Sequence, residues 1–121
     1  MLGVLYSKIK FSGIWLDMNE PSNFRGGEPF PEPYRVQHWD TLSNMTMNLN
    51  VQHYNANNVS DPLTHAEVHA YYGHLEVMAT YKFLESVHLR PFIITRSNSI
   101  GTGRFAGHWT GDNAATWPFI R

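Results

Sequence analysis

The sequence contains no cysteine, so this segment has no disulfide framework, no thiol nucleophile and no thiolate metal site. It also has no apolar run near the roughly 18 residues that a membrane span needs. Neither sign of charge dominates, because nine basic and ten acidic residues give a formal net charge of −1. This balance argues against nucleic acid or an anionic membrane as a partner and favours a neutral ligand. The oligomeric state stays open.

Two aspartates stand where active-site carboxylates are expected. Asp17 ends a strand-like apolar stretch at residues 13–17 and precedes a cluster of turn-forming residues, which is typical of an acid at the rim of a sheet or barrel. An Asx-turn or a helix N-cap is the alternative for Asp17. Asp112 follows Gly111 and lies between Trp109 and Trp117. Two acids at separate strand ends, each beside tryptophan, suggest a sugar site.

The rest of the chain reads as an α/β arrangement. A short helix or coil reaches about residue 12, and the strand at 13–17 follows. Glycine, spaced prolines and many asparagines predict a long loop at about 26–61, with room for one short helix or strand around 36–49. A helix at 65–86 and an apolar strand at 91–95 come next.

The helix at 65–86 has the clearest signals. Thr64 and Glu67 form a capping-box pattern at its start. Apolar residues then recur at helical spacing, and we expect this stripe to pack on the sheet: Val68, Tyr72, Leu75, Ala79 and Phe83. Strand, helix and strand in this order predict a parallel sheet of the barrel type, in which catalytic residues gather at the carboxyl ends of strands.

Four motifs together resemble the signatures of glycoside hydrolase family 31, the family of α-glucosidases. They are WLDMNEPS at 15–22, VHAYYG at 68–73, RPFIITRS at 90–97 and GHWTGDN at 107–113. The resemblance implies a (β/α)8 TIM barrel. Because such a barrel takes about 250 residues, the 121 residues are expected to form a single incomplete segment, from about strand 4 to strand 6.

The resemblance also assigns the catalytic pair. It implies that Asp17 is the nucleophile and Asp112 the general acid/base of a retaining glycosidase that forms a covalent glycosyl-enzyme. The negative charge of Asp17, and partial desolvation between Trp109 and Trp117, would keep the proton on Asp112. The two carboxyl groups of such a pair should lie about 5–5.5 Å apart. No cofactor is expected.

Arg96, Trp109 and Met18 match residues that line the sugar-binding subsite of the family. From chemistry alone, Arg96 could instead form a structural salt bridge, and Trp109 could be simple core. Glu20 and His108 are possible supports of the site. A satisfied structural histidine is an equal alternative for His108.

Three other functions compete with this one. His65 and His69, at i and i+4, could ligate a metal together, but the glutamate that follows the first histidine in zinc protease helices is missing, so we expect none. A non-catalytic carbohydrate-binding or truncated inactive module is the second alternative. Within the family, α-xylosidase or glucosidase II-like activity is the third, although the GHW sequence at 107–109 favours a maltase acting on α-1,4-linked oligosaccharides.

Two sequons, at Asn44 and Asn58, fall in the predicted loop. Glycans there would suit a secretory, lysosomal or extracellular protein. Chance occurrence in an asparagine-rich loop is the alternative, so the localisation stays open.

Overall fold

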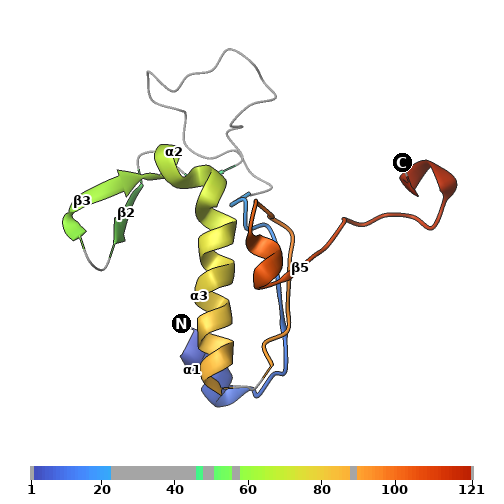
Figure 1. Ribbon diagram of the computed structural model, residues 1–121, viewed down its shortest axis with the longest axis horizontal. Helices are drawn as coiled ribbons and strands as arrows, with labels where there is room; N and C mark the ends of the chain where they lie inside the picture. The colour runs from blue at the N-terminus through green and yellow to red at the C-terminus, as the bar shows by residue number, and fades with distance from the viewer. Residues whose placement is uncertain (1, 23–45, 48–50, 56–57, 88–89, 121) are drawn as a thin grey trace, which may run out of the picture.

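The structure is a computed structural model that describes residues 2–22, 46–47, 51–55, 58–87 and 90–120 (Figure 1). The sequon at Asn44 and nearly all of the predicted element at 36–49 lie outside the described residues. Within the described part of the chain, no helix is both long and apolar enough to cross a membrane.

A parallel three-stranded sheet forms the centre of the fold. Its strands are β1 (Ile14–Leu16), β4 (Ile93–Thr95) and β5 (Gly107–His108), in the order β1-β4-β5. β1 pairs with β4 from Ile14↔Ile93 to Leu16↔Thr95, and Thr95 of β4 pairs with His108. The parallel direction confirms the α/β arrangement and brings the carboxyl ends of all three strands to one edge, which is where the predicted site residues begin.

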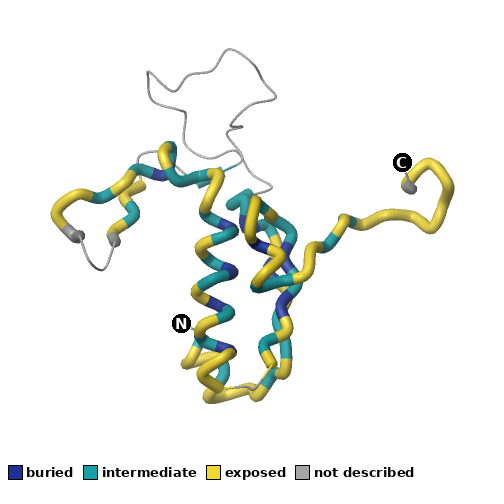
Figure 2. Tube along the Cα trace, in the orientation of Figure 1, coloured by how far each residue is buried: buried dark blue, intermediate teal, exposed yellow. Residues whose placement is uncertain are grey.

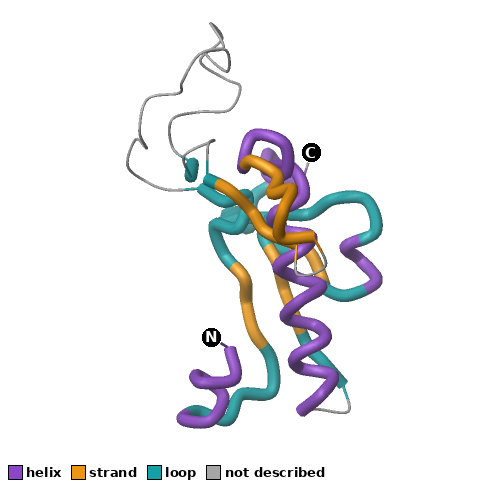
Figure 3. The backbone as a smooth tube through the Cα atoms, turned by 90° about the vertical axis from the view of Figure 1, so that its left-hand side faces the viewer, coloured by secondary structure: helices purple, strands orange, loops and turns teal. Residues whose placement is uncertain are grey.

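The predicted helix at 65–86 is present but is not uniform. It comprises α2 (His65–Val68), a 3-10 turn η1 (His69–Tyr71) and α3 (Tyr72–Val87). The backbone N–H and the hydroxyl of Thr64 both donate to the Glu67 carboxylate at 2.8 Å, which confirms the N-terminal cap. α3 runs along one side of the sheet (Figure 3).

The sequence analysis was wrong about which face of the helix packs on the sheet. Leu75 is 52% exposed, whereas Val77 and Leu84 are fully buried against Leu16 and Ile93. Figure 2 shows the buried positions of α3 mainly on the side of the helix that faces the strands. A small residue at position 73 lets the helix approach closely, since a Cβ there would lie 2.5 Å from Ser97 Oγ. The face of α3 that is buried against the sheet therefore carries Gly73, Val77, Thr80 and Leu84.

Two elements border this unit. The short helix α1 (Leu2–Lys8) contributes Tyr6, whose ring meets Phe11 and Phe83 edge-on. An antiparallel hairpin of β2 (Gln52–Asn55) and β3 (Asn58–Thr64) occupies the end of the segment predicted as loop. In Figure 1 this hairpin lies beside α2, on the side of α3 away from β5.

Candidate active site

Asp17 directly follows β1, and its carboxylate is accessible. Its side chain is 38% exposed, and Oδ1 accepts a hydrogen bond from the Met18 N–H at 2.9 Å. An Asx-turn would use the N–H two residues on, so this contact to the adjacent residue is not one. The residues that follow form turns, which also excludes a helix N-cap. Asp17 therefore presents an accessible carboxylate at the end of the strand.

Met18 has an unusual backbone conformation. Its φ is +54°, in the left-handed region that side chains other than glycine rarely adopt. The Met18 carbonyl accepts the Ser22 N–H at 2.9 Å, which closes the turn after β1. Strained residues of this kind cluster at active sites and ligand clamps.

Arg96 follows β4 and reaches across to the turn after β1. Its Nε and Nη2 each lie 2.9 Å from an oxygen of Glu20, and Nη2 also donates to Ser22 Oγ at 2.5 Å. Nη1 lies 3.6 Å from Asp17 Oδ1. The hydrogen bond from Arg96 lowers the pKa of Glu20, and the bond to Glu20 raises the pKa of Arg96. The structural salt bridge considered for Arg96 is therefore present, and it aims the remaining nitrogen at Asp17.

Asn19 is a site residue that the sequence analysis did not identify. It is 4% exposed, and both ends of its amide are bonded to the adjacent strand end. Nδ2 donates to Thr95 Oγ1, and Oδ1 accepts the Ser97 N–H, each at 2.8 Å. Its position between Met18 and Glu20, both named as site residues, was the only indication in the sequence that Asn19 belongs to the site. A buried amide in the turn between two acids fixes that turn.

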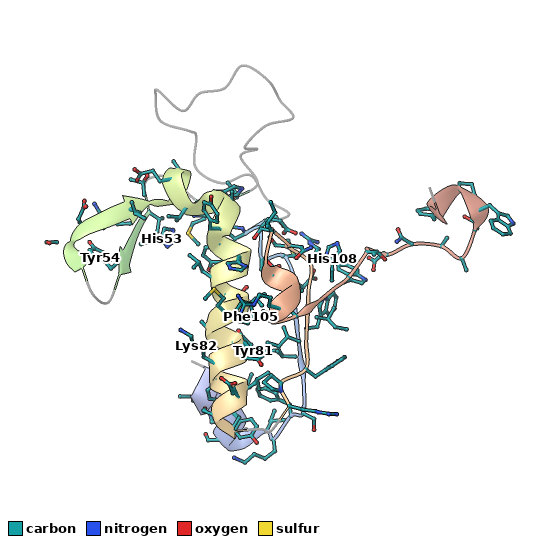
Figure 4. All side chains as sticks on the ribbon, viewed as in Figure 1. His53, Tyr54, Tyr81, Lys82, Phe105 and His108 are labelled. Carbon is teal, nitrogen blue, oxygen red and sulfur yellow. The ribbon has the colours of Figure 1, made fainter. Side chains whose placement is uncertain are left out.

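Trp109 lies close to the first acid motif. The centroids of the Trp109 and Trp15 rings lie 5.0 Å apart, with an interplanar angle of 77°. The backbone N–H of Trp109 donates to the Thr95 carbonyl at 3.1 Å. Trp15 is 54% exposed, so the pair presents aromatic surface rather than core. The sequence analysis named Trp109 for the site but not Trp15. His108 is exposed on β5, unlike a buried structural histidine (Figure 4).

Asp112 lies in an exposed segment after β5. Gly111 before it has φ +104°, which only glycine adopts freely, and Asn113 donates to Thr110 O at 2.8 Å. Both Asp112 and Asp17 contribute to the raised pKa of Arg96, after the larger effect of Glu20. Trp117 is 83% exposed. The expected desolvation of Asp112 between two tryptophans is therefore not seen, because the chain after Gly111 extends away from the sheet (Figure 1).

The histidines considered as metal ligands bind one another instead. His65 Nδ1 lies 3.1 Å from His53 Nε2, and His65 Nε2 lies 3.0 Å from His69 Nδ1. His65 is fully buried, and burial, with the neighbouring histidines, lowers its pKa to about 4. Both of its ring nitrogens are thus occupied. The described residues include no group of three or more histidines or acids arranged to hold a metal ion.

Comparison of the sequence with known proteins identifies a family. Residues 3–121 match the glycosyl hydrolases family 31 TIM-barrel domain. An alpha-glucosidase of Hordeum vulgare is 39% identical over 121 aligned residues, covering 93% of this chain and 13% of that protein. The lysosomal alpha-glucosidase of Mus musculus is 35% identical, covering 99% of this chain and 13% of the relative. Alpha-xylosidase 1 of Arabidopsis thaliana is 31% identical, covering 93% and 15%. The chain thus spans only a small part of the length of these relatives.

Proposed function

We propose that this chain, which belongs to glycosyl hydrolase family 31, supplies both catalytic carboxylates of a retaining α-glucosidase. The observation that carries the proposal is the accessible Asp17 at the carboxyl end of β1, with Arg96 at the end of the neighbouring strand 3.6 Å away. Asp112 follows the next strand of the same sheet. Catalytic groups of parallel α/β barrels come from such neighbouring strand ends.

In this proposal the two acids have different roles. Asp17 attacks the anomeric carbon and forms a covalent glycosyl-enzyme, while Asp112 donates a proton to the departing oxygen. Asp112 then takes a proton from water, which attacks the same carbon and releases Asp17. Retention requires the two carboxyl groups about 5–5.5 Å apart in the working enzyme. The Arg96 guanidinium, which is always charged, places a positive charge 3.6 Å from Asp17 Oδ1.

The subsite beside these acids would hold the sugar ring. Arg96 would also hydrogen-bond sugar hydroxyls, and Trp109 would cover the apolar face of a pyranose together with Trp15. Met18 would line the same subsite, with Glu20 and His108 in support. Partial exposure of Trp15 and Trp109 and the strained backbone of Met18 support this assignment.

We assign a maltose-like oligosaccharide with a terminal α-1,4-linked glucose as substrate. Alpha-glucosidase is the name of the barley and mouse relatives, and α-xylosidase that of one Arabidopsis relative. A xyloside lacks the hydroxymethyl group of a glucoside. Hydrolysis rates on an aryl α-glucoside and an aryl α-xyloside separate the two activities, and a preference for the xyloside would contradict our assignment.

We further propose that the chain works within a longer polypeptide, called here the full-length enzyme, as about the fourth to sixth strands of its barrel. The described sheet has three strands, and its outer strands leave backbone groups that a closed barrel would pair. The chain alone should therefore be inactive. Detectable turnover of an aryl α-glucoside by the purified 121-residue chain would contradict this.

Asp17→Asn in the full-length enzyme tests the assignment directly. The amide is neither an anionic nucleophile nor a stabiliser of positive charge at the anomeric carbon, so kcat on an aryl α-glucoside should fall by about 10³-fold or more. Asp61→Asn, an exposed position on β3, is the matched control and should leave kcat unchanged. Near-normal turnover of the Asp17 variant would exclude Asp17 as the nucleophile.

A further inference from the structure

The side chains at the ends of β1 and β4 fall into an accessible set and a buried set. Asp17, Glu20 and Arg96 have side chains that are 38%, 35% and 32% exposed. Asn19 and Thr95, which are their neighbours in the chain, are only 4% and 0% exposed. Buried polar side chains are thus interleaved with the groups that the proposed function places in the site.

One hydroxyl group organises the buried set. Thr95 Oγ1 accepts a hydrogen bond from Asn19 Nδ2 at 2.8 Å and donates to the Ser97 carbonyl at 3.0 Å. The Ser97 N–H donates in turn to Asn19 Oδ1 at 2.8 Å. The three residues therefore close a ring of hydrogen bonds, in which each end of the Asn19 amide has a partner of the right kind.

This ring joins Arg96 to the turn after β1. Thr95 and Ser97 flank the arginine in the chain, and both are bonded to the Asn19 amide. Asn19 itself lies in the turn that carries the two acids facing Arg96. Because the ring fixes both flanks of the arginine to that turn, a change in the ring would alter the distance between the guanidinium and the carboxylates.

The Thr95 hydroxyl decides which way the Asn19 amide faces. Its proton is donated to the Ser97 carbonyl, so toward Asn19 its oxygen can only accept, and only the NH2 end of the amide can pair with it. The reversed amide would set its oxygen against the hydroxyl oxygen and its NH2 group against the Ser97 N–H. Without the hydroxyl, a buried N–H of Asn19 would lose its partner, which is costly, so we expect Asn19 to move.

Helix α3 and strand β5 enclose the ring. A Cβ at Gly73 would lie 2.6 Å from Asn19 O and 2.5 Å from Ser97 Oγ, so the helix backbone packs directly on it. On the other edge, the Thr95 carbonyl accepts the Trp109 N–H at 3.1 Å. Since helix and strands hold the ring on these sides, a lost hydrogen bond should displace the turn after β1 rather than the sheet.

We propose that Thr95 is a positioning residue of the active site, whose hydroxyl orients the Asn19 amide and so fixes the turn that carries Asp17 relative to Arg96. This inference rests on the proposed function, since it concerns the placement of the nucleophile. Thr95 is fully buried and does not touch the substrate. A serine offers the same donor and acceptor and should serve as well, whereas valine offers neither.

Kinetics of the full-length enzyme test the proposal. Thr95→Val removes the hydroxyl at similar volume, and kcat on an aryl α-glucoside should fall about 10- to 100-fold with KM changed by less than about threefold, because a displaced nucleophile reacts slowly with a substrate that still binds. Thr95→Ser should recover kcat to within about threefold of the unmodified enzyme. Thr80→Val is the matched control, since Thr80 of α3 is also buried, at 2% exposure, and its loss should leave kcat unchanged.

A double-mutant cycle separates positioning from a general loss of stability. Because Thr95 acts through Asn19, the losses in kcat of Thr95→Val and Asn19→Ala should be strongly non-additive, with the double variant within about threefold of the less active single variant. Rates are expressed per folded molecule, with the folded fraction measured by near-ultraviolet circular dichroism. If Thr95→Val does not fold, Thr95→Ala takes its place and is compared with Thr95→Ser, from which it differs by the hydroxyl alone.

Hydrogen exchange tests the same ring without the reaction. The Ser97 amide belongs to the ring, and the Ser22 amide closes the turn after β1. Both should exchange about tenfold faster or more in Thr95→Val than in the unmodified enzyme, because the turn is no longer held. Thr95→Ser and Thr80→Val should leave the exchange of both amides unchanged.

Four results would overturn the inference: additive losses in the cycle, an unchanged kcat per folded molecule in the valine variant, equal losses in the serine and valine variants, or unchanged exchange of the two amides. Equal losses in serine and valine would mean that the methyl group, and not the hydroxyl, matters. Absence of α-glucosidase activity in the unmodified enzyme would instead contradict the proposed function. Hydrogen exchange would still show in that case whether Thr95 holds the turn, so the two failures are distinguishable.

Discussion

Arg96 and Glu20 form a bidentate ion pair in which Nε and Nη2 of the arginine each lie 2.9 Å from a carboxylate oxygen. Nη2 also donates to Ser22 Oγ, so Nη1 is the nitrogen left to face Asp17 at 3.6 Å. The ion pair therefore sets the direction of the guanidinium, and through it the charge that the nucleophile experiences.

Arg96→Lys should damage the site although it conserves the charge. An ammonium group cannot bond both oxygens of Glu20 and reach Asp17 as well. We expect kcat/KM of the full-length enzyme on an aryl α-glucoside to fall about 10²-fold. Arg104→Lys, at an exposed position, is the control and should be silent. Equal kcat/KM in the two variants would contradict the assignment of Arg96 to the active site.

Gly73→Ala tests how closely α3 must approach the site. The new Cβ would lie 2.5 Å from Ser97 Oγ and 2.6 Å from Asn19 O, so the helix or the turn must shift. We expect a loss of about 1–3 kcal/mol in the free energy of unfolding, together with a lower kcat. Gly103→Ala is the matched control, because a Cβ there meets no atom within 4 Å. Both quantities are measured on the full-length enzyme, and a neutral Gly73 variant would contradict this close packing.

His65 should make stability depend on pH. Its pKa is lowered from 6.5 to about 4 in the folded protein, so the folded state favours the neutral ring. The stabilisation from this neutral ring is complete above pH 6.5 and is lost as the pH falls toward 4. Between pH 7 and pH 4.5 the loss is about 2–3 kcal/mol.

Hydrogen exchange on the full-length enzyme can follow this loss in the hairpin β2–β3, which is joined to His65 through His53. Protection of the hairpin amides, corrected for intrinsic exchange, should fall as the pH is lowered. The His65→Gln variant lacks the titrating ring and should show a flatter dependence. The same slope in both proteins would assign the effect to other groups.

Asp112→Ala separates the role of Asp112 from that of Asp17. The variant of the full-length enzyme should be impaired most on substrates with poor leaving groups, which need a proton to depart. On a good leaving group the glycosyl-enzyme should accumulate, and added azide should restore turnover and give the α-glycosyl azide. With Asp17→Ala, azide would replace the nucleophile and give the β product. A β azide from the Asp112 variant would refute the roles assigned here.

Several elements could be predicted because their signals are local. The strand before Asp17 and the helix start at Thr64 depend on adjacent residues, and both are where the sequence predicts them. A strand before Asp112 was expected, but the bounds of β5 were not predicted, since its two residues, including Gly107, carry no strand pattern. The hairpin was not predicted either, because asparagines and Pro62 in β3 signal a loop.

Long-range contacts explain the remaining differences. The helix at 72–87 has apolar residues on more than one face, and the face buried in the structure is the one on which Gly73 closely approaches Ser97 and Asn19, so Val77 rather than Leu75 is buried. Asn19 acquires its role from Thr95 and Ser97, more than 70 residues away. Neither contact has a counterpart in local propensity or periodicity, so neither could be read from the sequence.

The row of His53, His65 and His69 has a further consequence. With all three rings neutral, each carries one proton, and the two bonds can run from His53 to His65 to His69 or in the reverse direction with no heavy atom displaced. The row can therefore reverse the direction of both hydrogen bonds while the hairpin and the helix keep their positions.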